Sequence, residues 1–213
     1  SLLLQMRRAP LTMALVIINI ALYPATRGID AGHFSDLLHL MTLVPFQQAA
    51  GYLYFSHLAD VLASMQYWRL LTPMFLHFSI MHIAFNLTFL WVFGSRIEVV
   101  SKSVVLLAVV LITSIASNLA QYALTGPTLF GGMSGVVAGL LGYCMVWSRL
   151  VPERSMGLAP PIYIGMIALL ALGAFGLFNF MTPGKIANGA HFGGLASGAA
   201  LGLLFGLFAR QKA

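Results

Sequence analysis

The sequence contains little charge. Only 8% of its 213 residues are Asp, Glu, Lys or Arg, whereas a soluble domain carries about 25%. Its hydrophobic content is 60%, and the apolar runs are long enough to predict an integral membrane protein. These runs are continuous rather than alternating every second residue, which argues against an outer-membrane barrel.

Cysteine is nearly absent as well. Cys144 is the single cysteine and lies inside an apolar run, so no disulfide can form within the chain and we expect a packing role. The spacing of His77, His82 and His191 is not that of a helical zinc site, and no carboxylate lies near them in the sequence. We therefore expect no metal and no cofactor.

The net charge of +6 does not indicate nucleic-acid binding, because the basic residues are scattered at the ends of apolar runs. That distribution is a topology signal in membrane proteins. With the N-terminus inside, eight Arg and Lys residues lie on the inner side and three on the outer side. This asymmetry predicts that both termini are cytoplasmic.

The apolar runs predict an all-α membrane protein with six transmembrane helices in a single domain, residues 1–213. Residues 25–76 are too polar to span and too apolar for a free linker, so we expect a long outer loop that is partly embedded in the membrane. The expected spans are approximately 10–24, 78–95, 104–124, 134–149, 160–179 and 190–209.

The fourth span begins at Ser134, within the run Gly131-Gly132-Met133-Ser134-Gly135. Glycines on both sides of a hydroxyl allow close backbone approach and leave N–H groups free to face a developing negative charge. The run is a weak signal by itself, since a glycine-rich chain contains such a sequence by chance.

Spans two, four and six all begin on the outer face in this topology. Polar groups are costly in a membrane and by default indicate a functional site. A lone His or Ser near a helix end is more often a satisfied interfacial residue, but several at one depth would need that explanation repeatedly. The first turns of these spans, with the residues just before them, carry His77, His82, Asn86, Ser134 and His191.

Small residues explain how a hydroxyl and an imidazole from distant spans come together. Small residues four apart allow helices in lipid to pack with their backbones in contact. Close packing would bring Ser134 and His191 within the hydrogen-bond reach that nucleophilic catalysis requires, without a carboxylate to complete a triad. The glycines concerned are Gly194, Gly198, Gly202 and Gly206 in the sixth span and Gly135 and Gly139 in the fourth.

Four motifs together resemble those of the rhomboid intramembrane serine proteases, of the bacterial GlpG-like type with a six-helix core. In this order, and on these spans, the set is highly specific, and the resemblance covers nearly the whole chain. The motifs are Gly132-Met133-Ser134-Gly135, Ala190-His191 followed by Gly194 and Gly198, His77 to Asn86, and Trp68-Arg69.

The resemblance implies that Ser134 is the nucleophile and His191 the general base. His82 and Asn86 are four residues apart and therefore share a helix face. By the same match, these two side chains and the backbone amides of Met133 and Ser134 would form the oxyanion hole.

Further roles follow from the same resemblance. The outer loop around Trp68 and Arg69 would lie half-submerged in the membrane, and His77 would tether this loop to the second helix. Glu98 would brace the inner end of the second span. Phe85 would lie where substrate enters beside the fifth span, and residues 180–189 would cap the site.

One position departs from the family pattern. Members commonly carry a Tyr one turn after the nucleophile, packed against the catalytic His, and here that position is Ala138. Phe192 or another aromatic residue is a candidate to replace it in orienting His191.

The sequence therefore predicts an intramembrane serine endopeptidase in a bacterial inner membrane, with its active site open to the periplasmic side. Its expected partners are membrane lipid and transmembrane substrates with helix-destabilising residues near the cut, and no nucleic acid. One alternative is an inactive rhomboid-like binding protein, although both Ser134 and His191 are retained. A small transporter or channel is less favoured, because the sequence has no inverted repeat and no charge at mid-membrane.

Overall fold

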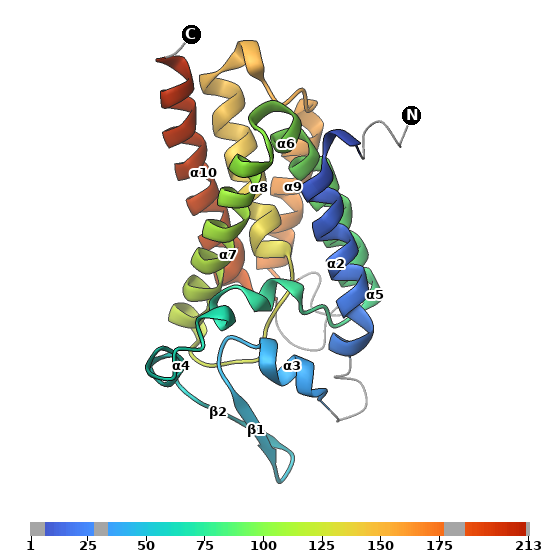
Figure 1. The fold of residues 1–213 in the computed structure, drawn as a ribbon, viewed down its shortest axis with the longest axis vertical. Coiled ribbons are helices and arrows are strands. Elements are labelled where there is room, and N and C mark those ends of the chain that lie inside the picture. Colours follow the sequence, from blue (N-terminus) through green and yellow to red (C-terminus); the bar gives the residue numbers. More distant parts are fainter. Residues whose placement is uncertain (1–6, 28–33, 177–185, 212–213) are drawn as a thin grey trace.

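The structure, a computed structural model, describes residues 7–27, 34–176 and 186–211. Its apolar helices form an upright bundle, and both ends of the chain lie at the same end of that bundle (Figure 1). The bundle helices are α2 (Pro10–Thr26), α5 (Ile80–Phe89) continued by α6 (Ser95–Ser101), α7 (Ser103–Thr125), α8 (Ser134–Leu150), α9 (Pro160–Ala174) and α10 (Asn188–Arg210).

Three helical stretches are long and apolar enough to cross a membrane, judged by length and composition: Ile80–Ser101, Ser103–Thr125 and Asn188–Arg210. The other bundle helices, α2, α8 and α9, are apolar but shorter, with 17, 17 and 15 residues. Each of these helical stretches overlaps one of the apolar runs in the sequence. The second stretch differs most, because it continues to Ser101 instead of ending near residue 95.

A π-helical turn, Leu90–Gly94, joins α5 to α6 and lengthens this second stretch. Beyond it, the buried carboxylate of Glu98 accepts hydrogen bonds from the backbone N–H groups of Leu11 and Thr12, at 2.7 and 2.8 Å. It also accepts from the hydroxyls of Thr12 and Ser103, both at 2.7 Å. These N–H groups open α2 and have no partner within their own helix. Glu98 therefore ties α2, α6 and α7 together.

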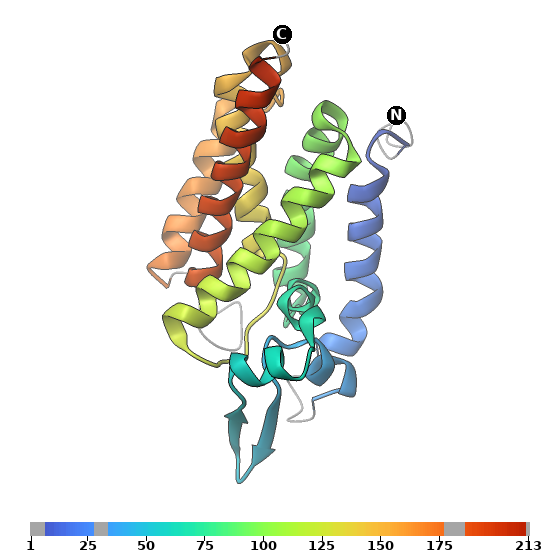
Figure 2. The ribbon, with the colours of Figure 1, turned by 60° about the vertical axis from the view of Figure 1, so that its left-hand side comes forward.

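The chain between α2 and α5 forms a separate outer layer at the end of the bundle opposite the termini (Figures 1 and 2). It contains helices, 3₁₀ turns and one antiparallel β-hairpin. Its elements are α3 (Asp36–Met41), β1 (Phe46–Ala49), β2 (Tyr52–Phe55), α4 (Leu58–Ala63), η2 (Tyr67–Leu70) and η3 (Thr72–Phe75).

The hairpin is the part of this layer that the sequence prediction did not include. Its two-residue turn, Ala50 and Gly51, has positive φ at both positions, 50° and 81°, which suits the right-handed twist of the flanking strands. The second strand, Tyr52–Phe55, is rich in aromatic residues that favour a pleated strand. The fold is otherwise helical, as predicted.

Arg69 and Trp68 hold the outer layer together. The buried guanidinium of Arg69 donates to the carbonyl oxygens of His39, at 2.7 Å, and Thr42, at 2.9 Å. The indole N–H of Trp68 donates to the Leu40 carbonyl oxygen at 3.2 Å, while its side chain is 44% exposed. Both residues therefore fasten the C-terminal end of α3 to the segment that leads into α5.

Candidate active site

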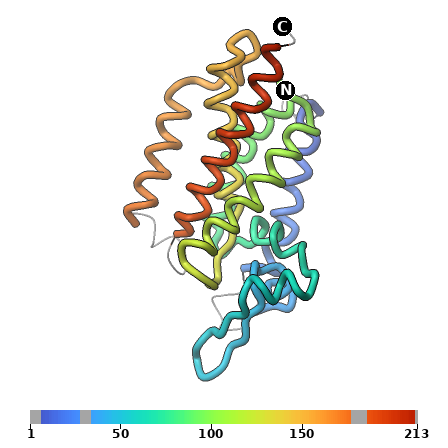
Figure 3. The backbone as a smooth tube through the Cα atoms, turned by 90° about the vertical axis from the view of Figure 1, so that its left-hand side faces the viewer, coloured from blue at the N-terminus to red at the C-terminus, as the bar shows by residue number. Residues whose placement is uncertain are grey.

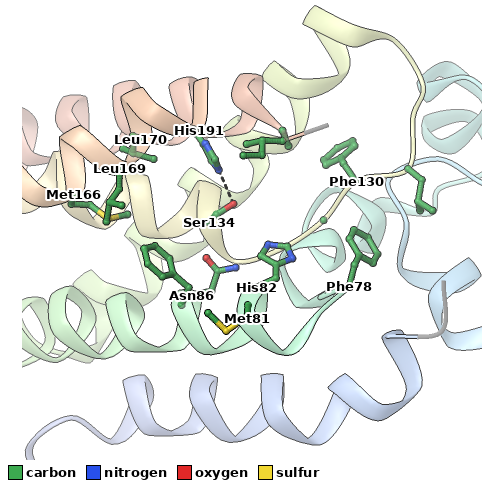
Figure 4. A pocket seen from close by; sticks show the side chains of 16 residues that line it. Phe78, Met81, His82, Asn86, Phe130, Ser134, Met166, Leu169, Leu170 and His191 are labelled. Carbon is green, nitrogen blue, oxygen red and sulfur yellow. Dashed lines mark hydrogen bonds between the residues drawn. The ribbon is translucent and has the colours of Figure 1, made fainter. Parts of the chain in front are cut away.

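Ser134 and His191 meet where α8 and α10 begin. Ser134 is the first residue of α8, and His191 lies in the first turn of α10. The Ser134 Oγ and the His191 Nε2 are 2.9 Å apart (Figure 4). A hydroxyl and an imidazole at this distance have the geometry that a nucleophile and its general base require.

Glycines in both helices make this approach possible. A Cβ added to Gly194 would overlap the carbonyl oxygen of Gly135, and one added to Gly198 would overlap the carbonyl oxygen of Gly139. Backbone therefore packs on backbone along α8 and α10, as small residues four apart permit. Gly135 follows Ser134 directly, so the contact with Gly194 fixes the separation of the two helices at the level of the dyad.

The segment before Ser134 is held against the start of α5. The Gly132 N–H donates to the Pro73 carbonyl oxygen at 2.9 Å. A Cβ on Gly131 would lie 2.5 Å from the Leu76 Cβ, so that position requires glycine. Gly132 has φ +116°, and a Cβ there would lie 2.5 Å from the His82 Nε2. Both the backbone conformation and the lack of space therefore require glycine at this position.

His77 is fully buried beneath this segment. Its Nδ1 lies 3.3 Å from the Phe75 carbonyl oxygen, and its Nε2 accepts a hydrogen bond from the Met133 N–H at 3.3 Å. Burial, assisted by the neighbouring His82, lowers the pKa of His77 to about 3. The imidazole is therefore neutral, with Nδ1–H as donor to Phe75 and Nε2 as acceptor.

This contact bears on one expectation. The family resemblance places the Met133 amide in an oxyanion hole, and in this structure the same N–H donates to His77. His77 tethers the segment just before Ser134 to the start of α5, and this bond removes a donor from the space around the Ser134 hydroxyl.

His82 and Asn86 face Ser134 from one side of α5 (Figure 4). The space that a Gly132 Cβ would fill is bounded by the His82 Nε2 and, at 3.4 Å, by the Asn86 Nδ2. The buried Asn86 Nδ2 and His82 Nδ1 have no hydrogen-bond partner among the described residues. An unpaired buried donor costs about 1–3 kcal/mol, so the Asn86 Nδ2 is a candidate hydrogen-bond donor to a group bound beside Ser134.

A largely apolar cavity of about 170 Å³ surrounds the dyad. Phe85 lines it from α5 and is 39% exposed, so this side chain lies both at the cavity and at the surface of the bundle. On the other side, α9 lies at the edge of the bundle (Figure 3) and buries only Met166 and Gly173 of its 15 residues. The α9 residues that line the cavity are Met166, Leu169, Leu170 and Gly173.

Among the described residues, no polar group supports the far side of the His191 ring. The buried His191 Nδ1 has no hydrogen-bond partner within the described parts of the chain. Ala138 is fully buried and offers only a methyl group, while Phe192 is 60% exposed. Phe192 is therefore not the aromatic residue that orients His191. The expected cap, residues 180–189, lies mostly outside the described residues.

Sequence reasoning missed a polar stripe on α7. Its residues are buried and recur at helical spacing on one face of an otherwise apolar helix, a pattern that is visible in the sequence itself. Gln121 and Asn118 carry its two amides, which bond to Ala190 of α10 and Leu70 of the outer layer. The stripe consists of Thr113, Ser114, Ser117, Asn118 and Gln121.

Within residues 7–27, 34–176 and 186–211, no group of three His, Cys, Asp or Glu side chains is placed to hold a metal ion. The polar side chains around Ser134 are the imidazoles of His82 and His191 and the amide of Asn86.

A family model, the rhomboid domain, matches residues 64–208. The match spans well over half of the chain and includes Trp68-Arg69, the α5 pair His82 and Asn86, and both Ser134 and His191. With apolar helices throughout the bundle, the protein is an integral membrane protein. The chain belongs to the rhomboid family.

Proposed function

We propose that this protein is an intramembrane serine endopeptidase that cleaves transmembrane proteins near the outer face of the membrane. The observation that carries the proposal is the 2.9 Å hydrogen bond between the Ser134 Oγ and the His191 Nε2. This pair lies on a cavity lined by residues of α5 and α9, between which a membrane-embedded peptide would approach.

In the proposed reaction, the Ser134 Oγ attacks the carbonyl carbon of the scissile peptide bond while its proton passes to the His191 Nε2. The carbonyl electrons move onto oxygen, which becomes an oxyanion. When they return, the C–N bond breaks and His191 gives its proton to the leaving amine. Water then attacks the acyl-enzyme while its proton passes to the His191 Nε2, and His191 gives this proton to the Ser134 Oγ as the acid is released.

The oxyanion would be stabilised by the Asn86 amide, by the His82 ring and by the Ser134 N–H at the start of α8. The Asn86 Nδ2 and His82 Nε2 border the space that a Cβ on Gly132 would fill. Donors that are in place before the reaction need no reorganisation. Met133 has no part in this proposal, because its N–H donates to His77.

We further propose the GlpG-like arrangement, with six spans, cytoplasmic termini and the site open to the periplasmic side of a bacterial inner membrane. Both ends of the chain lie at one end of the bundle (Figure 1), as an even number of spans requires. Arg7, Arg8 and Arg210 lie near these ends, in keeping with positive residues inside.

The proposed substrate is a transmembrane helix that enters between α5 and α9. The entrance is lined by Phe85, Leu169 and Leu170, side chains that suit an apolar helix. A helical peptide bond is shielded by its own hydrogen bonds, so cleavage requires local unwinding. Helix-destabilising residues near the cut, such as Gly or Pro, would lower the free energy of that step.

The test is cleavage of a single-span substrate by the purified protein in liposomes, beside Ser134→Ala and His191→Ala. The proposal expects cleavage by the parent chain and none above background by either variant, with thermal unfolding showing that both remain folded. Equal cleavage by a variant would overturn the dyad. A folded parent chain that binds several such substrates and cleaves none would instead identify an inactive rhomboid-like binding protein.

A further inference from the structure

Apart from its hydrogen bond to Ser134, His191 is positioned by the backbone of α10. Its Nδ1 has no hydrogen-bond partner among the described residues, and Ala138 supplies no ring to pack against it. Its own N–H donates to the Ala187 carbonyl oxygen at 3.2 Å, which begins the α10 ladder. The residue at the N-cap, Ala187, provides no side-chain cap.

Gln121 of α7 provides the hydrogen-bond acceptor that the N-cap residue of α10 does not. The Gln121 Oε1 accepts a hydrogen bond from the Ala190 N–H at 3.2 Å. Ala190 is the third residue of α10, so its N–H has no acceptor within its own helix. The Gln121 Nε2 donates to the Thr125 Oγ1 at 3.3 Å, which orients the amide with its oxygen toward α10.

The fit between the two helices at this level is tight. Gln121 is buried, with 5% exposure, and a Cβ on Gly189 would lie 2.8 Å from both the Gln121 Cα and Oε1. A Cβ on Gly193 would lie 2.5 Å from the Ala120 Cβ. The first turn of α10 therefore lies directly against α7, and Gln121 holds the residue immediately before His191.

We propose that Gln121 is a positioning residue for His191, acting as a cap supplied to α10 from another helix; this inference rests on the proposed protease function. In an apolar bundle, the buried Ala190 N–H needs an acceptor. Without Gln121, the first turn of α10 unwinds or shifts to find one. Either movement displaces the His191 Nε2 from the Ser134 Oγ.

The test compares three variants of the full chain. Gln121→Met keeps the length of the side chain and removes the acceptor, whereas Gln121→Glu keeps an oxygen that can accept from Ala190. Asn118→Leu is the matched control: it removes another buried α7 amide, which donates to the Leu70 carbonyl oxygen at 2.8 Å and not to α10.

Two measurements are made on each variant well below its Tm: amide hydrogen exchange in the first turn of α10, and the rate at which a fluorophosphonate labels Ser134. For Gln121→Met we expect faster exchange and labelling slowed by about tenfold to a hundredfold, as misplaced catalytic groups give. Peptide cleavage should fall in kcat with KM nearly unchanged. Gln121→Glu should retain most of the labelling rate, and Asn118→Leu should label like the parent chain.

The inference is overturned if Gln121→Met leaves both measurements unchanged, or if Asn118→Leu slows labelling equally, which would show a general loss of packing. Failure of the proposed function looks different, because the parent chain itself would then neither react with the fluorophosphonate nor cleave. Hydrogen exchange in Gln121→Met still decides between a clamped and an unclamped first turn in that case.

Discussion

The two sides of the active-site cavity are built in opposite ways. On one side, α8 and α10 pack with backbone on backbone, so that no Cβ fits at Gly194 or Gly198. On the other side, α9 buries two residues of its 15 and has open space at Gly165, where an added Cβ meets nothing within 4 Å. The Ser134–His191 pair is thus fixed to the closely packed side, and the proposed entrance for substrate lies on the side of α9.

The comparison also explains why polar groups lie where they do. The proposed nucleophile, the proposed oxyanion donors and the α7 stripe lie on α5, α7, α8 and α10, which pack closely against one another. The α9 face contributes only apolar side chains to the cavity. In the proposed function, this separation would let a substrate helix enter beside α9 without displacing Ser134 and His191.

The largest effect is expected from breaking the closely packed side. Gly194→Val places side-chain atoms where the Gly135 carbonyl oxygen lies, so α8 and α10 must separate and His191 moves away from Ser134. We expect loss of cleavage and a lower Tm. Gly165→Val, in the open face of α9, is the control. This variant should keep the cleavage activity and the Tm of the parent chain. Equal behaviour of the two variants would remove the distinction between the two sides.

The next effect concerns the oxyanion donors. Asn86→Ala removes the unpaired Nδ2 beside Gly132, and we expect kcat to fall by about a hundredfold to a thousandfold, as for other donors of this kind. KM should change little, since the bond forms mainly in the transition state. Thr88→Ala serves as control, because that hydroxyl bonds to the Ala84 carbonyl oxygen on an exposed part of α5. A fall in the Thr88 variant as large as that in the Asn86 variant would contradict the assignment.

A smaller effect is expected from the tether beneath the nucleophile segment. The pKa of His77 is lowered to about 3 from an ordinary value of 6.5. Between these two pH values, His77 is protonated in the unfolded chain and stays neutral in the folded chain. His77 therefore reduces stability as pH falls from 6.5 toward 3, by up to about 1.4 kcal/mol per pH unit. Above pH 6.5 both states are neutral there and the effect disappears.

Replacing the titrating group should reveal this slope. In His77→Gln, the Tm should decline less steeply between pH 7 and pH 4 than in the parent chain, while the Tm at pH 8 is lowered by loss of the fit to Met133. The measurement is a series of thermal scans in one detergent across that pH range. Parallel curves for the two proteins would show that His77 is not the buried neutral group described above.

The smallest effect should come from the side of α9. Leu170→Ala widens the proposed entrance beside Phe85 and removes a side chain that is only partly buried, so we expect the Tm to change slightly. Cleavage kinetics in liposomes should change in KM for a transmembrane substrate more than in kcat. Leu172→Ala, 43% exposed on the same helix and outside the cavity lining, is the matched control. A large loss of kcat in Leu170→Ala would mean that α9 shapes the dyad directly.

Several features could be read from the sequence because they depend on local pattern. The apolar runs locate the helices of the bundle to within a few residues at most ends, and a small residue every fourth position predicts which helices approach closely. Ser134 and His191 could be paired for the same reason. Ser134 directly precedes Gly135 of α8, and His191 lies about one helical turn before Gly194 of α10. Rhomboid membership followed from motifs whose order along the chain is itself visible.

Other features depended on contacts between distant residues. The sequence could not show that the Met133 N–H donates to His77, since the two lie 56 residues apart, nor that Phe192 faces outward while Gln121 meets Ala190. The hairpin at 46–55 also escaped prediction, because short strands form only when a turn and a packed neighbour agree. The spacing of residues in the sequence thus determined which helices could touch and which residues could react. The tertiary structure decided which hydrogen-bond donors remained free, because that outcome depends on all the groups that surround each donor.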